Sequence, residues 1–107
     1  TNLYSADLSS MDIEDSDLSH TQLGNANLAK AILSQVDLKY ADLNQTNFKG
    51  TTLGIFMVDL RATNLESASN LSSANFLGGP LINSRELKAL PHLKGKVTVQ
   101  DELSKYH

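Results

Sequence analysis

Residues 26–48 read ANLAKAILSQVDLKYADLNQTNF, and a large apolar residue returns at almost every fifth position of this stretch. The spacing continues in both directions, unbroken from Leu3 to Leu53 and, after two irregular steps, on to Leu81. A period of five matches neither an α-helix, with about 3.6 residues per turn, nor a continuous strand, with a period of about 2. The positions that we expect to form the structural core are Leu3, Leu8, Ile13, Leu18, Leu23, Leu28, Leu33, Leu38, Leu43, Phe48, Leu53, Leu60, Leu65, Leu71, Phe76 and Leu81.

Each pentad is interpreted as a short strand followed by a turn. In the pentad that begins at Ala26, Ala26 and Leu28 share one face, because alternate strand residues point the same way, and Asn27 points outward. The two residues that complete most pentads are small or polar, as turns prefer. Each pentad is therefore predicted to form one side of a polygon with its apolar residues inside. Close packing favours four sides, since three would crowd the leucines and six would leave a void.

The best-formed pentads are ADLSS at 6–10, ANLAK at 26–30, ADLNQ at 41–45 and ANFLG at 74–78. On these pentads the chain resembles the pentapeptide-repeat family, whose consensus is A(D/N)Lxx. The resemblance implies an all-β solenoid, a right-handed quadrilateral β-helix with twenty residues per coil. Counting through the two irregular steps gives about four coils.

The pattern changes near residue 81, so we expect a β-helix over residues 1–81 and a C-terminal capping helix with a tail over residues 82–107. Asn83 and Glu86 have the spacing of a capping box. Leu87 and Leu90 share one helical face, and Pro91 ends the helix. A solenoid must cover the apolar end of its last coil, and this segment is placed to do so.

Composition excludes several kinds of site. The chain has no cysteine, so it forms no disulfide and no thiolate metal site. Residues 1–80 contain 9 acids and 4 bases, whereas residues 81–107 contain 3 acids and 5 bases. The repeats therefore lack the basic surface typical of nucleic-acid binding. We expect no direct binding of nucleic acid, and no apolar run approaches the ~18 residues of a membrane span.

Stacking by about twenty residues, with allowance for the first irregular step, places Asp17, Asp37 and Asp59 in one column roughly 5 Å apart. Adjacent carboxylates repel each other. Ser19, Lys39 and Arg61 occupy the neighbouring column and can offset that repulsion. Two readings stay open: a solvated lattice of ions, or a docking face for a basic partner.

The first irregular step inserts a segment at residues 54–57, because Leu53 and Leu60 are seven residues apart. Insertions in a solenoid emerge on its outside. Ile55, Phe56 and Met57 would be exposed there unless they fold back or meet a partner. Both a packed segment and a recognition loop are therefore considered, and these three residues are candidate interaction residues.

The leading functional hypothesis is a non-catalytic protein-interaction or scaffolding module, because solenoids offer regular faces and enzymes need convergent pockets. None of His20, His92 and His107 has a second ligand at metal spacing, so we predict no catalytic or metal site and no cofactor. The alternative, implied by the family resemblance alone, is a DNA mimic that modulates a type II topoisomerase. Its weakness is the modest negative charge of the repeats.

The expected partner is another protein, and a cytoplasmic location is favoured, although an exported mature form is compatible with the first residue, Thr1. Thr1 to Leu3 is already in register with the repeats, so the first coil begins without a cap. Either upstream coils are missing from this chain, or two molecules meet end to end in a small isologous contact.

Overall fold

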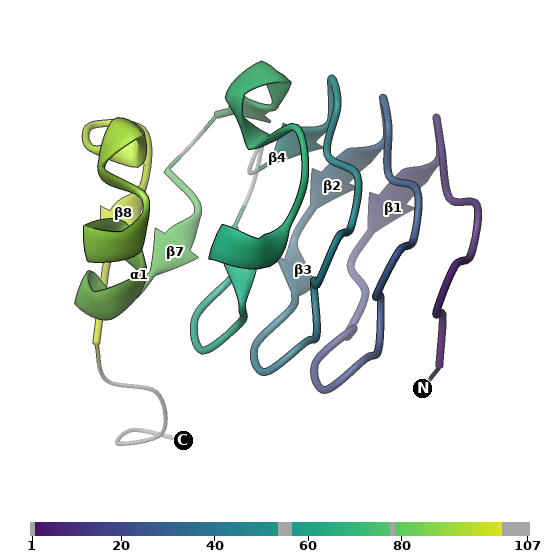
Figure 1. Cartoon of the computed structure of the whole chain (residues 1–107), viewed down its shortest axis with the longest axis horizontal. Helices are drawn as coiled ribbons and strands as arrows, with labels where there is room; N and C mark the ends of the chain where they lie inside the picture. The colour runs from purple at the N-terminus through teal and green to yellow at the C-terminus, as the bar shows by residue number, and fades with distance from the viewer. Residues whose placement is uncertain (1, 54–56, 78, 102–107) are drawn as a thin grey trace.

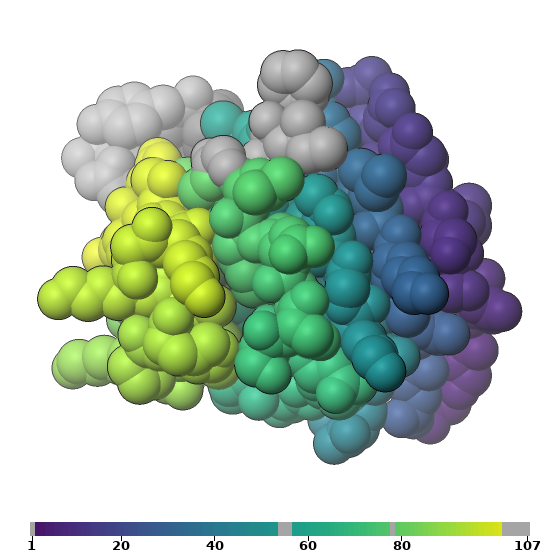
Figure 2. Space-filling model, turned by 90° about the horizontal axis from the view of Figure 1, so that it is seen from above, coloured from purple at the N-terminus to yellow at the C-terminus, as the bar shows by residue number. Residues whose placement is uncertain are grey.

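The computed structural model describes residues 2–53, 57–77 and 79–101. Figure 1 shows a solenoid in which the chain advances along the long axis from the N-terminal coil to the C-terminal helix. The space-filling view shows the coils following one another in sequence order along this axis (Figure 2). None of the helices among the described residues is long and apolar enough to cross a bilayer.

The strands are short and lie in two parallel sheets. The first sheet has the order β1 (Asp12–Glu14), β2 (Ile32–Ser34), β4 (Thr52–Leu53) and β6 (Asn75–Phe76). The second has the order β3 (Val36–Asp37), β5 (Val58–Asp59), β7 (Leu81–Ile82) and β8 (Thr98–Val99). Within each sheet the strands follow one another in sequence order and pair in parallel, so the parallel β-solenoid predicted from the repeat is confirmed.

The pairing register records both irregular steps. Asn27 pairs with Asn47, twenty residues later, which is the regular coil of four pentads. Val36 pairs with Val58, twenty-two residues later, so two residues are inserted between Leu53 and Val58. Thr52 pairs with Asn75, twenty-three residues later, and the third extra residue lies beyond Ser69. A short 3₁₀-helix, η2 (Leu71–Ser73), occupies this second step, and η1 (Leu65–Ser67) precedes it.

The corners explain why Asp or Asn stands at the middle of most pentads. The side-chain oxygen of Asn27 accepts the backbone N–H of Ala29 at 3.0 Å, two residues along, and Asp42 accepts that of Asn44 in the same way. Short side chains with an acceptor form such turns readily. The last residue of each regular pentad then has a positive φ, for example 62° at Lys30. The repeat thus uses its outward polar residue to fold each corner.

The core lies inside the coils. Leu28, Leu38 and Phe48 are fully buried, whereas Leu8 and Leu18 in the first coil are only half-buried. The structure also buries Leu3 and Ile13 only in part, and it buries Leu23, Leu33, Leu43, Leu53, Leu60, Leu65 and Leu71, with Phe76 half-buried. Burial therefore depends on having a coil on each side.

Leu81 departs from its expected position. The predicted core residue pairs with Asp59, which is an outward position, and Ile82 takes the inward place with no exposed surface. The corner before β7 contains Gly79 with a φ of 66° and then Pro80, and it uses one residue more than a regular pentad. Leu81 is nevertheless buried, and it pairs on its other side with Thr98 of β8.

The C-terminal helix α1 (Ser84–Ala89) begins with the capping box that the sequence predicts. The Asn83 side chain accepts the backbone N–H of Glu86 at 2.8 Å, and the Glu86 carboxylate accepts that of Asn83 at 2.9 Å. After the helix, Leu90 and Leu93 join the buried apolar cluster of the coils. Leu93 ends a 3₁₀-helix, η3 (Pro91–Leu93).

Glu86 also ties the helix to the solenoid. Its second carboxylate oxygen accepts the backbone N–H of Thr63 at 2.9 Å, and the residue is almost fully buried. Burial raises the pKa of Glu86, although the hydrogen bonds from Asn83 and Thr63 and the charge of Arg85 act in the opposite direction. The carboxylate therefore joins two backbone segments that are distant in the sequence.

We predict that Glu86→Gln lowers the free energy of unfolding by about 1–3 kcal/mol, because one amide N–H₂ then faces a buried backbone N–H. Chemical denaturation measures this change. The matched control is Glu66→Gln, at an exposed carboxylate of η1, and it should change stability by less than about 0.5 kcal/mol. Equal effects of the two substitutions would show that the Glu86 link contributes nothing.

Candidate interaction surface

The structure brings the three candidate aspartates into one column. Asp17 pairs with Asp37, and Asp37 pairs with Asp59, so the side chains project from successive coils on the wall formed by β3 and β5. Asp17 is exposed, Asp37 is half-buried and Asp59 is buried. The column therefore runs from solvent at the N-terminal end into the body of the protein.

A partner for each aspartate lies two residues further along the chain. The Ser19 hydroxyl donates to Asp17 at 2.6 Å. Lys39 Nζ lies 3.4 Å from Asp37 and 3.6 Å from Asp59. The buried Arg61 donates to both carboxylate oxygens of Asp59, through Nε at 2.9 Å and Nη2 at 2.7 Å. The negative charge of the column is thus offset most strongly at Asp59.

The ionisation of the column follows from these contacts. Hydrogen bonds from the Ser19 hydroxyl and backbone hold the pKa of Asp17 below its ordinary value. Burial by itself would raise the pKa of Asp59, but the hydrogen bonds and charge of Arg61, with the charge of Lys39, lower the pKa overall. Both groups are therefore anionic at neutral pH.

An open groove of about 540 Å³ follows the column where the two sheets meet. Its lining residues are Asp15, Ser16, Asp17, Gln35, Val36, Asp37, Lys39, Met57 and Asp59. Met57 is 65% exposed, the largest exposure among the large apolar side chains of the described residues. The groove therefore combines carboxylates with one projecting thioether, which suits an occupant with both basic and apolar groups.

The candidate residues are thus partly brought together. Asp17, Asp37, Asp59 and Met57 line one groove, whereas Ile55 and Phe56 lie outside the described residues. Sequence reasoning missed Asp15 and Gln35 as lining residues. The sequence does contain a signal for these two residues. Asp15 and Gln35 occupy equivalent corner positions twenty residues apart, two residues before Asp17 and Asp37.

The described residues give little support for a metal site or for a catalytic histidine. No group of three or more His, Asp and Glu side chains there has a geometry that could hold a metal ion. His20 stacks on Tyr40 with ring centroids 4.8 Å apart, at an outside corner of the solenoid. Its environment is that of a surface histidine.

Comparison with known proteins agrees with the repeat. Residues 16–54 match the family model described as pentapeptide repeats, in eight copies. Two solved structures of trypsin-treated variants of QnrB1, a plasmid-mediated fluoroquinolone resistance protein, share the fold with TM-scores of 0.68 and 0.69 at 19% identity. They cover 94% and 92% of this chain, which spans 45% and 46% of theirs. A search of curated proteins found no match.

Proposed function

Because this chain is a pentapeptide-repeat protein, we propose that it is a non-catalytic module that binds another protein or serves as a scaffold for it. The groove beside the aspartate column carries this proposal, since it joins carboxylates to the exposed Met57. The groove is open to solvent, unlike the enclosed clefts in which the polar groups of enzymes converge. The preferred occupant is a basic segment of a partner protein that reaches Asp15 and Asp17, the groove carboxylates that have no ion pair with a described residue, and that has an apolar side chain for Met57.

The proposal includes the finer architecture, a right-handed quadrilateral β-helix of about four coils over residues 1–81. Regular pairing at twenty residues, which is four pentads, supports four sides. The proposal also assigns residues 82–107 to a C-terminal cap and tail. The burial of Leu90 and Leu93 with the core of the coils supports that assignment.

Positive charge introduced into the lining of the groove tests the docking site. Asp15→Lys with Gln35→Lys should abolish selection of Lys- and Arg-rich sequences from a displayed peptide library. Both residues are exposed corner residues, and Lys30 shows that lysine fits such a corner. The control carries the same charge change on other corners, through Ser5→Lys, Ser10→Lys and Gln45→Lys. Equal loss of selection in both variants, or no basic selection by the parent protein, would reject the groove.

A second candidate function is a DNA mimic that modulates a type II topoisomerase. The shared fold with QnrB1, a fluoroquinolone resistance protein, favours it. The neutralisation of Asp37 and Asp59 by Lys39 and Arg61 weighs against it, since a DNA mimic needs an uncompensated acidic face. A supercoiling assay with DNA gyrase distinguishes the two, because the module proposed above leaves supercoiling unchanged even at large molar excess.

A further inference from the structure

The aspartate column has one cation fewer than it has carboxylates. Three carboxylates are paired in register on successive coils, those of Asp17, Asp37 and Asp59. Lys39 and Arg61 form ion pairs with the column from the positions two residues further along the second and third coils. At the same position of the first coil, the Ser19 hydroxyl donates a hydrogen bond and brings no charge. The gap between the first two aspartates therefore lacks the cation that the gap between the second and third aspartates holds.

The second gap shows how the column holds a cation. Lys39 Nζ lies 3.4 Å from Oδ2 of Asp37, in its own coil, and 3.6 Å from Oδ2 of Asp59, in the next coil. The other oxygens fold the corners, because Oδ1 of Asp37 accepts the backbone N–H of Lys39 and Oδ1 of Asp59 accepts that of Arg61. The Oδ2 atoms of two neighbouring aspartates thus approach a common point, and an ammonium group occupies it.

The first gap has the same frame, and the structure describes the coils on both of its sides. Oδ1 of Asp17 accepts the backbone N–H of Ser19 at 3.0 Å, as Oδ1 of Asp37 accepts that of Lys39. The Ser19 hydroxyl also donates to Oδ1 of Asp17, at 2.6 Å. Oδ2 of Asp17 has no hydrogen bond or ion pair with a described residue. Both aspartates line the groove, so this gap is open to a group from outside.

We propose that the gap between Asp17 and Asp37 is a subsite for a primary ammonium group, the end of a lysine side chain of the partner protein, held as the second gap holds Lys39. The subsite rests on the proposed function, because it lies in the same groove, and it names the group of the partner that the groove holds. A lysine placed there completes a row in which carboxylates and cations alternate as far as Arg61.

The occupied oxygens favour an ammonium over a guanidinium. The two-bond pairing of arginine uses both oxygens of one carboxylate, and Arg61 pairs in this way with Asp59 of its own coil. On Asp17, Oδ1 already accepts two hydrogen bonds from Ser19, so Oδ2 is the oxygen left for a partner. An ammonium has three donors on one nitrogen and needs only one oxygen from each of two carboxylates.

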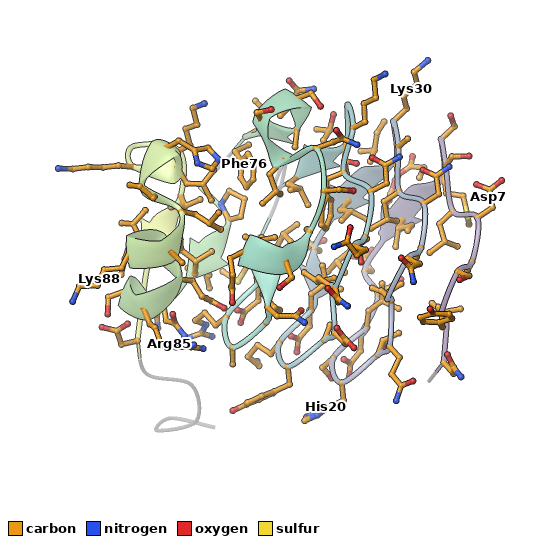
Figure 3. All side chains as sticks on the ribbon, in the orientation of Figure 1. Asp7, His20, Lys30, Phe76, Arg85 and Lys88 are labelled. Carbon is orange, nitrogen blue, oxygen red and sulfur yellow. The ribbon has the colours of Figure 1, made fainter. Side chains whose placement is uncertain are left out.

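Another wall of the first coil has the same corner without a second carboxylate. Oδ1 of Asp7 accepts the backbone N–H and the hydroxyl of Ser9, at 3.1 and 2.7 Å, which reproduces the corner of Ser19. The residue paired with Asp7 in the next coil is the uncharged Asn27. Figure 3 shows Asp7 and His20, the residue that follows Ser19, at different edges of the first coil. Asp7 and Ser9 are therefore matched control positions.

Fluorescence anisotropy with a labelled tetralysine peptide tests the subsite on the full chain. A second peptide, in which every lysine is trimethylated, has the same charge but no N–H donors on its side chains. At about 20 mM salt, where exposed charges are weakly screened, the tetralysine peptide should bind at least about fivefold more tightly than the trimethylated one. Equal affinity would mean attraction by charge alone and would overturn the subsite. So would the absence of tetralysine binding at about 1 mM protein.

Two substitutions locate the bound ammonium. Ser19→Lys supplies a built-in ammonium at the position that Lys39 has one coil later, and Asp17→Asn removes one carboxylate while keeping a corner hydrogen bond that asparagine makes elsewhere in the repeats. Each should weaken binding of tetralysine by roughly tenfold. The controls Ser9→Lys and Asp7→Asn make the same charge changes on the other wall, and each should weaken binding by less than about twofold. Equal losses at the matched positions would contradict the assignment of the gap.

Protein stability gives a second readout that needs no ligand. The lysine of Ser19→Lys should reach two carboxylates, whereas that of Ser9→Lys should reach one. The urea midpoint of Ser19→Lys should therefore be the higher of the two. A midpoint at or below that of Ser9→Lys would show that the gap does not hold an ammonium between two carboxylates.

These measurements separate the subsite from the function on which it rests. Tetralysine binding that depends on Ser19 and Asp17, in a protein that selects no basic sequence from a displayed peptide library, supports the subsite and rejects the wider docking role. Selection of basic sequences that survives Ser19→Lys overturns the subsite and leaves the proposed function in place.

Discussion

Leu28→Ala should lower the free energy of unfolding by about 2–5 kcal/mol, because the truncated side chain leaves a cavity in a closely packed core. Leu28 is 2% exposed and is covered by a coil on each side. Urea denaturation followed by circular dichroism measures the change. The slope of the transition should stay constant, since the same surface is exposed on unfolding.

Leu8→Ala is the matched control for this experiment. Leu8 has the same position in its pentad and lies one coil earlier, but it is only half-buried. Its truncation should cost about half as much as that of Leu28, because less apolar surface leaves water on folding. Equal costs at the two positions would contradict the expectation that the cost follows the burial of the leucine.

Arg61→Met should lower the free energy of unfolding by about 3–5 kcal/mol, since it leaves the carboxylate of Asp59 buried without its main partner. Arg61 and Asp59 are 4% and 6% exposed, and two hydrogen bonds join their side chains. Asp59→Asn combined with Arg61→Met should recover most of the loss. Asn27 and Asn47 show that asparagine forms the same corner hydrogen bond.

The parent protein and the Arg61→Met variant should also differ in how the free energy of unfolding depends on pH. In the parent, the pKa of Asp59 is lower when folded, so the stabilisation is complete above the ordinary value of 3.8 and is lost as pH falls through the folded pKa. In Arg61→Met, burial dominates and raises that pKa. The variant should therefore gain stability as pH falls from neutral through the raised pKa. Parallel pH profiles of the two proteins would contradict the role assigned to Arg61.

The five-residue period predicted much of this fold, because the structure of each pentad is determined by residues close together in the sequence. The inward Leu, the outward Asp or Asn and the corner pair are all short-range features, and the capping box of Asn83 and Glu86 is equally local. The positions of both insertions followed from the spacing of leucines. The exchange of Leu81 for Ile82 was not predictable, since spacing alone does not show how many residues the corner at Gly79 and Pro80 uses.

The candidate surface was less accessible to sequence reasoning. The stacking of Asp17, Asp37 and Asp59 follows from the coil length once the insertion is placed. The burial of Asp59 with Arg61 depends on what the third coil packs against, and no local pattern shows this. The groove depends further on where the two sheets meet. Long-range packing therefore decided the parts that the sequence left open.

The stepwise change in pairing register has a consequence for folding. Identical repeats permit a coil to pair one repeat too early or too late, and such slipped arrangements are kinetic traps for repeat proteins. Here the pairing distance changes from twenty residues between Asn27 and Asn47 to twenty-two between Val36 and Val58, twenty-three between Thr52 and Asn75, and twenty-two again between Asp59 and Leu81. A coil that slips by one repeat would place polar corner residues inside and leucines outside along part of its length. The irregular steps therefore favour the native pairing register over registers shifted by one repeat.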